Sequence, residues 1–106
     1  MSDDAAPANN AGAAVPPDAL SRELPIINKR GLHARAAAKF VQALEHLDCE
    51  VTVSKDGTDV SGRSIKGEMM LAAGPGSELA LSATGPDAAA GLSALAELVQ
   101  RGFDED

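Results

Sequence analysis

The pattern of apolar and polar positions along the chain predicts strands that alternate with helices. Over residues 22–28, Leu24 and Ile26 alternate with Glu23 and Pro25, which indicates a first strand with one buried face. Pro25 has no N–H to donate to a neighbouring strand, so we expect this strand at the edge of a sheet. Residues 28–31 are then typical of a turn.

The next segment has the spacing of an amphipathic helix over 34–47. Its apolar stripe recurs at intervals of three and four residues and consists of Ala37, Phe40, Val41, Leu44 and Leu47. Its polar face carries Lys39, Gln42 and Glu45. We therefore expect this helix to lie on a sheet with Lys39 exposed.

A β-hairpin follows the helix. Val51 and Val53 alternate with polar residues over 50–55, and Asp56-Gly57 is a favoured pair for a two-residue turn. Residues 58–61 then form the returning strand.

The second half of the chain predicts a short helix, a strand and a long helix. Ser64 is a good N-cap for a helix over 65–71, which Gly67 weakens, and we expect Ile65, Met69 and Met70 on its inner face. After a turn at 74–76, residues 78–84 alternate as a strand. The last helix begins near Pro86 and Asp87 and ends at Gly102, and its apolar stripe consists of Leu92, Leu95, Leu98 and Val99.

This order, βαββαβα, predicts an α+β domain. The economical arrangement is a two-layer open-faced sandwich, in which a four-stranded, mainly antiparallel sheet carries three helices on one face. Residues 1–21 are rich in Ala, Pro, Asn and Asp and predict a flexible acidic leader. The domain then covers 22–103, and an acidic tail covers 104–106.

Charge is distributed unevenly along the chain. The net charge is −7, of which the leader and the tail contribute six negative charges, whereas nine basic and ten acidic residues between 22 and 103 nearly cancel. With two Phe and no Trp or Tyr, the chain has few rings for stacking on bases. We therefore expect no binding of nucleic acid.

Other signals indicate a cytoplasmic protein. No apolar run is long enough to span a membrane, and the N-terminus lacks the pattern of a secretory signal. The single cysteine, Cys49, cannot form an internal disulfide, and its acidic neighbours make it a poor nucleophile. We interpret it as a small, partly buried side chain.

Candidate chemistry gathers at His33, at the start of the first helix. Backbone N–H groups of Ala34, Arg35 and Ala36 have no helical partner there, which favours binding of an anion. Further positive charge comes from Lys29, Arg30, Arg35 and Lys39. The other histidine, His46, fits a surface position near the end of the same helix. No metal-ligand cluster, second acid–base group or glycine-rich phosphate loop supports a stand-alone enzyme.

Two stretches resemble the signatures of one family. Residues 28–35, Asn-Lys-Arg-Gly-Leu-His-Ala-Arg, followed by a helix through Phe40-Val41, resemble the active-site signature of HPr, the histidine phosphocarrier of the bacterial phosphoenolpyruvate-dependent phosphotransferase system. Residues 64–71, Ser-Ile-Lys-Gly-Glu-Met-Met-Leu, resemble its second signature. Together with the element order, the resemblance covers residues 22–102.

The resemblance implies a phosphoryl carrier without a cofactor. His33 would accept a phosphoryl group on its Nδ1 atom from phosphorylated enzyme I and pass it to an EIIA-type protein, with Arg35 holding the phosphate. A neutral imidazole is needed for this attack, and the helix start together with Arg35 favours that state. We expect a monomer that other enzymes act upon.

Ser64 has two roles under this interpretation. It caps the short helix, and the resemblance implies that a dedicated serine kinase and phosphorylase act on it in many members; whether such a kinase exists here is left open. The partner surface is expected to combine a partly exposed apolar patch with nearby cations. Its members are Ile65, Met69, Met70, Lys39, Arg63 and Lys66.

One departure from the family pattern bears on its subgroup. Ala36 stands where many members have proline, and this favours the nitrogen-related, regulatory branch over the sugar-transport branch. The sequence leaves the branch and the acceptor open, together with any role of residues 1–21. An alternative function also stays open: a non-catalytic regulatory module that binds an anion or a protein through His33 and Arg35.

Overall fold

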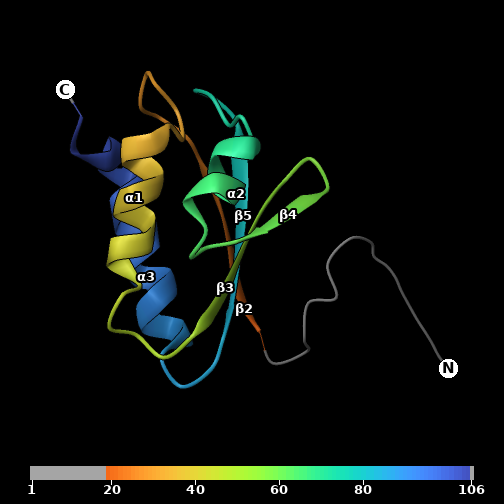
Figure 1. Cartoon of the computed structure of the whole chain (residues 1–106), viewed down its shortest axis with the longest axis vertical. Coiled ribbons are helices and arrows are strands. Elements are labelled where there is room, and N and C mark those ends of the chain that lie inside the picture. Colours follow the sequence, from red (N-terminus) through yellow and green to blue (C-terminus); the bar gives the residue numbers. More distant parts are fainter. Residues whose placement is uncertain (1–18, 106) are drawn as a thin grey trace, which may run out of the picture.

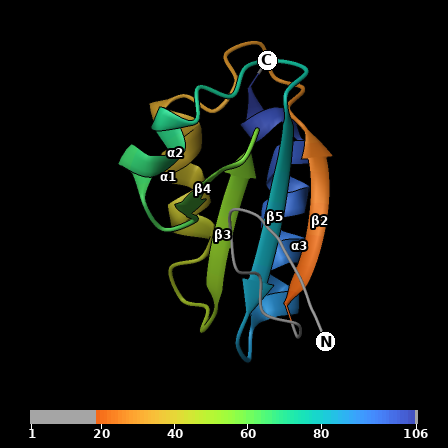
Figure 2. The same ribbon diagram turned by 90° about the vertical axis from the view of Figure 1, so that its right-hand side faces the viewer.

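The chain forms the predicted open-faced sandwich. The computed structural model describes residues 19–105, in which one antiparallel sheet has the strand order β2-β5-β3-β4. The strands are β2 (Leu20–Pro25), β3 (Glu50–Lys55), β4 (Thr58–Ser61) and β5 (Glu78–Thr84). The helices are α1 (Ala34–Ala43), α2 (Ile65–Met70), α3 (Ala88–Gln100) and the 3₁₀ turn η2 (Gly102–Asp104). The three α-helices lie on one side of the sheet, as Figures 1 and 2 show.

Strand β2 occupies one edge of the sheet. It pairs with β5 alone, and Pro25 lies opposite Glu78 at its end, which confirms the edge position. The strand begins at Leu20, so residues 20 and 21 belong to the sheet and not to the predicted leader. The rest of that predicted leader, residues 1–18, lies outside the described residues, as does Asp106.

The hairpin between β3 and β4 is confirmed. Asp56 and Gly57 both have positive φ, 51° and 84°, and they join strands paired from Lys55 with Thr58 onward. Two positive φ angles match the twist of a two-residue hairpin turn, which explains the Asp-Gly pair.

The core lies between the sheet and the helices. Its innermost apolar side chains are at most 1% exposed and come from helices α1 and α3, the central strands β3 and β5, and segments outside these elements. They include Ile26, Phe40, Leu44, Val53, Leu79, Leu81, Leu95, Val99 and Phe103. Helix α3 ends as predicted, with Gly102 at φ 64°. Among residues 19–105, no helix is both long and apolar enough to cross a bilayer.

Helix α2 presents a different face to the core from the predicted one. Ile65, Met69 and Met70 are 40%, 46% and 72% exposed, whereas Glu68 is fully buried. Glu68 and buried Leu71 are three residues apart and share the inward side of this short helix. The predicted inner face was therefore wrong, because the most apolar residues of a one- to two-turn helix need not mark its buried side. The expected exposed apolar patch on α2 is present.

Candidate functional site

Helix α1 starts directly after a turn that contacts the loop following α2. Gly31 has φ 66°, and a Cβ atom at this position would lie 2.2 Å from the carbonyl oxygen of Ala73. The next residue, Leu32, donates its backbone N–H to that same oxygen at 2.8 Å. Glycine is therefore required here by both the left-handed conformation and the close approach.

His33 is the N-cap residue of α1. Its backbone is extended, with φ −83° and ψ −178°, and its carbonyl oxygen accepts the N–H of Ala37 at 2.8 Å. Its imidazole makes no capping hydrogen bond, so the ring is available for other contacts. Helix geometry leaves the N–H groups of Ala34, Arg35 and Ala36 without intrahelical acceptors beside that ring.

The imidazole of His33 contacts the end of the chain. Its Nε2 atom is hydrogen-bonded to Oε2 of Glu105, and the two side chains are 14% and 20% exposed. Asn28, which is buried, donates from Nδ2 to Oε1 of Glu105 at 3.0 Å and to the carbonyl oxygen of Gly31 at 2.8 Å. The Asn28 amide therefore links the turn before α1 to the carboxylate that contacts His33.

A C-terminal hook, residues 101–105, brings Glu105 to this place. Gly102, Phe103 and Asp104 have φ angles of 64°, 57° and 61°, so the chain reverses through three successive left-handed residues. Such a conformation is costly for Phe and persists where packing enforces it. The ring of Phe103 is fully buried, with its centroid 5.6 Å from that of Phe40, and its carbonyl oxygen accepts Nζ of Lys39 at 2.6 Å.

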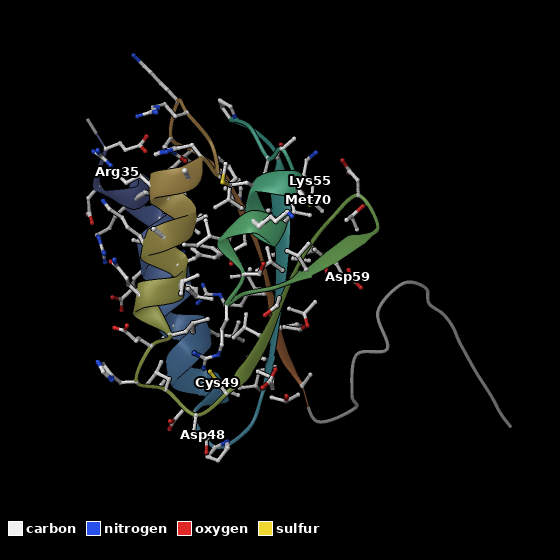
Figure 3. The ribbon with its side chains drawn as sticks, in the orientation of Figure 1. Arg35, Asp48, Cys49, Lys55, Asp59 and Met70 are labelled. Atoms are coloured by element: carbon white, nitrogen blue, oxygen red, sulfur yellow. The ribbon has the colours of Figure 1, made fainter. Side chains whose placement is uncertain are left out.

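The predicted cations gather beside the hook. A basic hollow of about 390 Å³ is lined by Lys29, Arg30, Arg35, Lys39, Asp104 and Glu105. Figure 3 shows Arg35 at the beginning of α1, next to the C-terminal segment. The sequence pattern anticipated the four cations, whereas the two acidic residues come from the tail and were not anticipated as part of the site.

Glu105 is held in its ionised form. The hydrogen bond from Asn28 lowers its pKa most, followed by the hydrogen bond from His33, and the charges of His33 and Arg30 act in the same direction against partial desolvation. The carboxylate therefore remains charged through the neutral pH range and accepts hydrogen bonds from both partners.

Two cations expected on the partner surface have structural contacts. Lys39 is half-buried and binds the hook through Phe103. Arg63 donates from Nη1 to the carbonyl oxygen of Leu44 at 2.8 Å, and from Nη2 to those of Leu47 and Cys49 at 2.7 and 2.9 Å. Their charges are therefore less available to a partner than the sequence suggested, because the folded chain uses them for its own carbonyl groups. Lys66 is exposed.

Ser64 is the N-cap of α2, as predicted. Its Oγ atom accepts the backbone N–H of Gly67 at 3.0 Å, and the residue is partly exposed beside the apolar patch of α2. Phosphorylation of this hydroxyl would add charge at a helix start and next to that patch.

Cys49 and His46 lie in surroundings that do not favour a catalytic role. Cys49 is buried, and burial, followed by the charges of Asp87 and Asp48, raises its pKa against the influence of Arg63, so it is a poor nucleophile. His46 is exposed. Within residues 19–105, no group of three or more His, Cys, Asp or Glu side chains is arranged to hold a metal ion.

Sequence reasoning missed two members of the site. The sequence places Asn28 in a turn and at the start of the first signature without assigning it a role, and it predicts Glu105 only as tail charge. The contact between His33 and Glu105 joins residues 72 positions apart, so no local spacing could indicate it. An acidic residue soon after the end of the last helix was the single available signal.

A family model, related sequences and solved structures all place this chain in the same family. Residues 20–101 match the family model described as the PTS HPr component phosphorylation site. The chain is 49% identical over 84 residues to the phosphocarrier protein HPr of Pseudomonas aeruginosa, covering 78% of this chain and 93% of that one. It is 45% identical over 86 residues to the HPr of Cupriavidus necator, covering 81% and 97%. The crystal structure of an HPr from Thermoanaerobacter tengcongensis is similar with a TM-score of 0.78 and 38% identity, covering 82% of this chain and 98% of that one.

Proposed function

This chain belongs to the HPr family of phosphocarrier proteins of the bacterial phosphotransferase system, and we propose that His33 is the residue that carries its phosphoryl group. Phosphorylated enzyme I is the donor in this proposal, and an EIIA-type protein is the acceptor. The observation that carries it is the position of His33 at the start of α1, with one ring nitrogen bound and the helix N–H groups alongside.

The ring of His33 has distinct roles for its two nitrogen atoms. Nε2 is bonded to Glu105, whereas Nδ1 makes none of the hydrogen bonds found among residues 19–105. A nucleophile needs a lone pair that is not already engaged, so Nδ1 is the atom that attacks the phosphorus. The phosphoryl group would then be carried on Nδ1.

The start of α1 supports the phosphate once it is bound. Unpaired N–H groups of Ala34, Arg35 and Ala36 and the positive end of the helix dipole favour the phosphate oxygens. Arg35 is exposed at the same end of α1 and adds a guanidinium that can form charge-assisted hydrogen bonds.

The exposed face of α2 is the proposed docking surface for both partners. Ile65, Met69 and Met70 form an apolar patch, and Lys66 is exposed next to it. Helices α1 and α2 pack against each other and lie side by side on the same face of the sheet (Figure 1). Flexible methionine side chains suit a surface that must fit two different partners in turn.

Ser64 is the proposed regulatory site. A phosphate there would lie next to the apolar patch and would disturb docking by its charge, without removing the cap from α2. Incubation with a serine kinase of this system and ATP is expected to label the wild type and leave Ser64→Ala unlabelled. Equal labelling of the two proteins would contradict the assignment.

The phosphocarrier proposal is tested with phosphoenolpyruvate and enzyme I. The wild type is expected to acquire phosphate that is labile in acid and stable in base, and His33→Ala to acquire none. His46→Ala is the matched control, because it removes the chain's other histidine from an exposed position. Labelling that persists in His33→Ala, or disappears in His46→Ala, would overturn the proposal. A wild type that binds enzyme I without being labelled would favour a regulatory binding module instead.

A further inference from the structure

The C-terminal hook brings a carboxylate to the imidazole of His33. Its reversal passes through two non-glycine residues in the left-handed region, Phe103 and Asp104, and it delivers one carboxylate to one ring nitrogen. That carboxylate is oriented by Asn28, which is itself buried and bonded to the turn before α1. Glu105 therefore contacts Asn28 through one carboxylate oxygen and the imidazole of His33 through the other.

We propose that Glu105 is a positioning residue for phosphoryl transfer, which keeps a proton on Nε2 of His33 both before and after phosphorylation. The proposal rests on the proposed function of His33. In the unphosphorylated protein, the carboxylate accepts the Nε2–H, so the lone pair remains on Nδ1. In the phosphorylated protein, the same carboxylate lies beside the Nε2–H of a positively charged ring.

The charge on that ring follows from the bonds that change. The Nδ1 lone pair forms the bond to phosphorus while the bond from phosphorus to the donor breaks, and its electron pair leaves with the donor. The ring keeps its Nε2 proton and therefore becomes a phosphorylated imidazolium. When the phosphoryl group passes on, the electrons of the Nδ1–P bond return to the ring, and a protonated ring is the better leaving group. A carboxylate on Nε2–H stabilises this protonated form by charge and hydrogen bond.

Five other charged side chains line the basic hollow beside the hook. They are Lys29 and Arg30 from the turn, Arg35 and Lys39 from α1, and Asp104 from the hook. Four of these five are positive. Among the charged side chains that line this hollow, Glu105 is the one with a hydrogen bond to Nε2 of His33. Removing the charge of Glu105 is therefore expected to change the protonation of the phosphorylated ring more than removing the charge of Asp104.

The test compares two conservative variants at adjacent positions. Glu105→Gln removes the charge that contacts His33, and Asp104→Asn removes the same charge one residue earlier, where asparagine tolerates the left-handed backbone. Each protein is phosphorylated with phosphoramidate, a small phosphoryl donor that needs no partner protein. The midpoint at which the phosphorylated ring loses its Nε2 proton is then followed by ³¹P and ¹H NMR, and hydrolysis of the phosphoryl group is measured across the same pH range.

In Glu105→Gln, we expect this midpoint to fall by about one pH unit, as the loss of one nearby opposite charge predicts for a partly exposed pair. At pH values above both midpoints, the rate of phosphoryl loss then falls about tenfold, because the protonated fraction does. Asp104→Asn is expected to match the wild type within about 0.3 unit, because it keeps the hydrogen bond between Glu105 and Nε2.

Equal shifts in the two variants would overturn the proposal, because they would indicate a general effect of charge. The proposal is also overturned if the midpoint shifts in neither variant, or if the phosphoryl group of the wild type is found on Nε2. Failure of enzyme I to label the wild type would instead contradict the proposed function, and the phosphoramidate experiment does not depend on that result.

Discussion

Two regions of this molecule each contain a glutamate, and the surroundings of the two differ: Glu105 is partly buried at the His33 site, and Glu68 is fully buried on the inward side of α2. At the His33 site, Glu105 is bonded to Asn28 and His33, and these hydrogen bonds lower its pKa. Beneath the α2 face, Glu68 is fully buried, both of its carboxylate oxygens lack a partner in the described chain, and burial raises its pKa to about 8. The same side chain is therefore ionised in one place and protonated near neutral pH in the other.

The contrast shows that hydrogen-bond donors keep a buried carboxylate ionised. Moving a carboxylate out of water is unfavourable, and hydrogen bonds from an amide and an imidazole offset that cost at Glu105. Glu68 has no such donors within residues 19–105, so it responds to burial by retaining its proton. The His33 site thus holds a charged carboxylate, whereas α2 exposes an apolar patch and buries a carboxyl group that has no donor among the described residues.

The largest expected effect concerns the packing that forms the hook. Phe103→Ala removes a fully buried ring in contact with Phe40 and is expected to lower the free energy of unfolding by about 3–5 kcal/mol. Urea unfolding followed by circular dichroism measures it. Phe103→Leu, which keeps most of the apolar volume, is expected to lose less than half as much. A loss below about 1 kcal/mol in Phe103→Ala would mean that polar contacts alone hold the hook.

An intermediate effect is expected at Glu68. Its pKa of about 8 lies above the ordinary value of 4.5, so the folded chain retains a proton that the unfolded chain releases. Unfolding is then favoured increasingly as the pH rises from about 4.5 to about 8, by up to about 1.4 kcal/mol per pH unit, and levels off above that range. At pH 7 the penalty amounts to at most about 3 kcal/mol.

Glu68→Leu is therefore expected to raise the free energy of unfolding by about 1–3 kcal/mol at pH 7 and by much less at pH 5. Glu68→Gln is the matched control, because it loses this pH dependence while leaving a polar group without a partner. The measurement is urea unfolding of the three proteins at pH 5, 7 and 8.5. The free energies of unfolding of the wild type and Glu68→Gln could instead differ by the same amount at all three pH values. That result would show that Glu68 is ionised in the folded protein, and the contrast with Glu105 would disappear.

The smallest effect is expected at the start of α2. Ser64→Ala removes the acceptor for the N–H of Gly67 and is expected to cost about 1 kcal/mol. Ser64→Asp keeps an oxygen acceptor at the cap and is expected to remain within about 0.5 kcal/mol of the wild type. Thermal unfolding of the three proteins tests this. If Ser64→Asp is destabilised as much as Ser64→Ala, the hydroxyl acts through something other than capping.

Patterns read over a few residues predicted most of the fold. The Asp56-Gly57 turn, the alternation in β5, the stripe of α3 and the cap at Ser64 all depend on neighbours in the chain, and each is found where it was expected. The resemblance to HPr likewise depended on two short signatures. The face of α2 was not predictable in this way, because six residues are too few to establish a helical stripe.

The chain by itself determined the order of its elements, the antiparallel hairpin and the location of His33 at a basic helix start, because these follow from local conformational preference and hydrophobic period. The tertiary structure decided which groups surround the imidazole. Burial of Phe103 against Phe40 turns the end of the chain back across α1, and only then does Glu105 reach a histidine 72 positions earlier. It also decided that Lys39 and Arg63 bind backbone carbonyls and that Glu68 is enclosed, because burial and hydrogen bonding depend on neighbours distant in sequence.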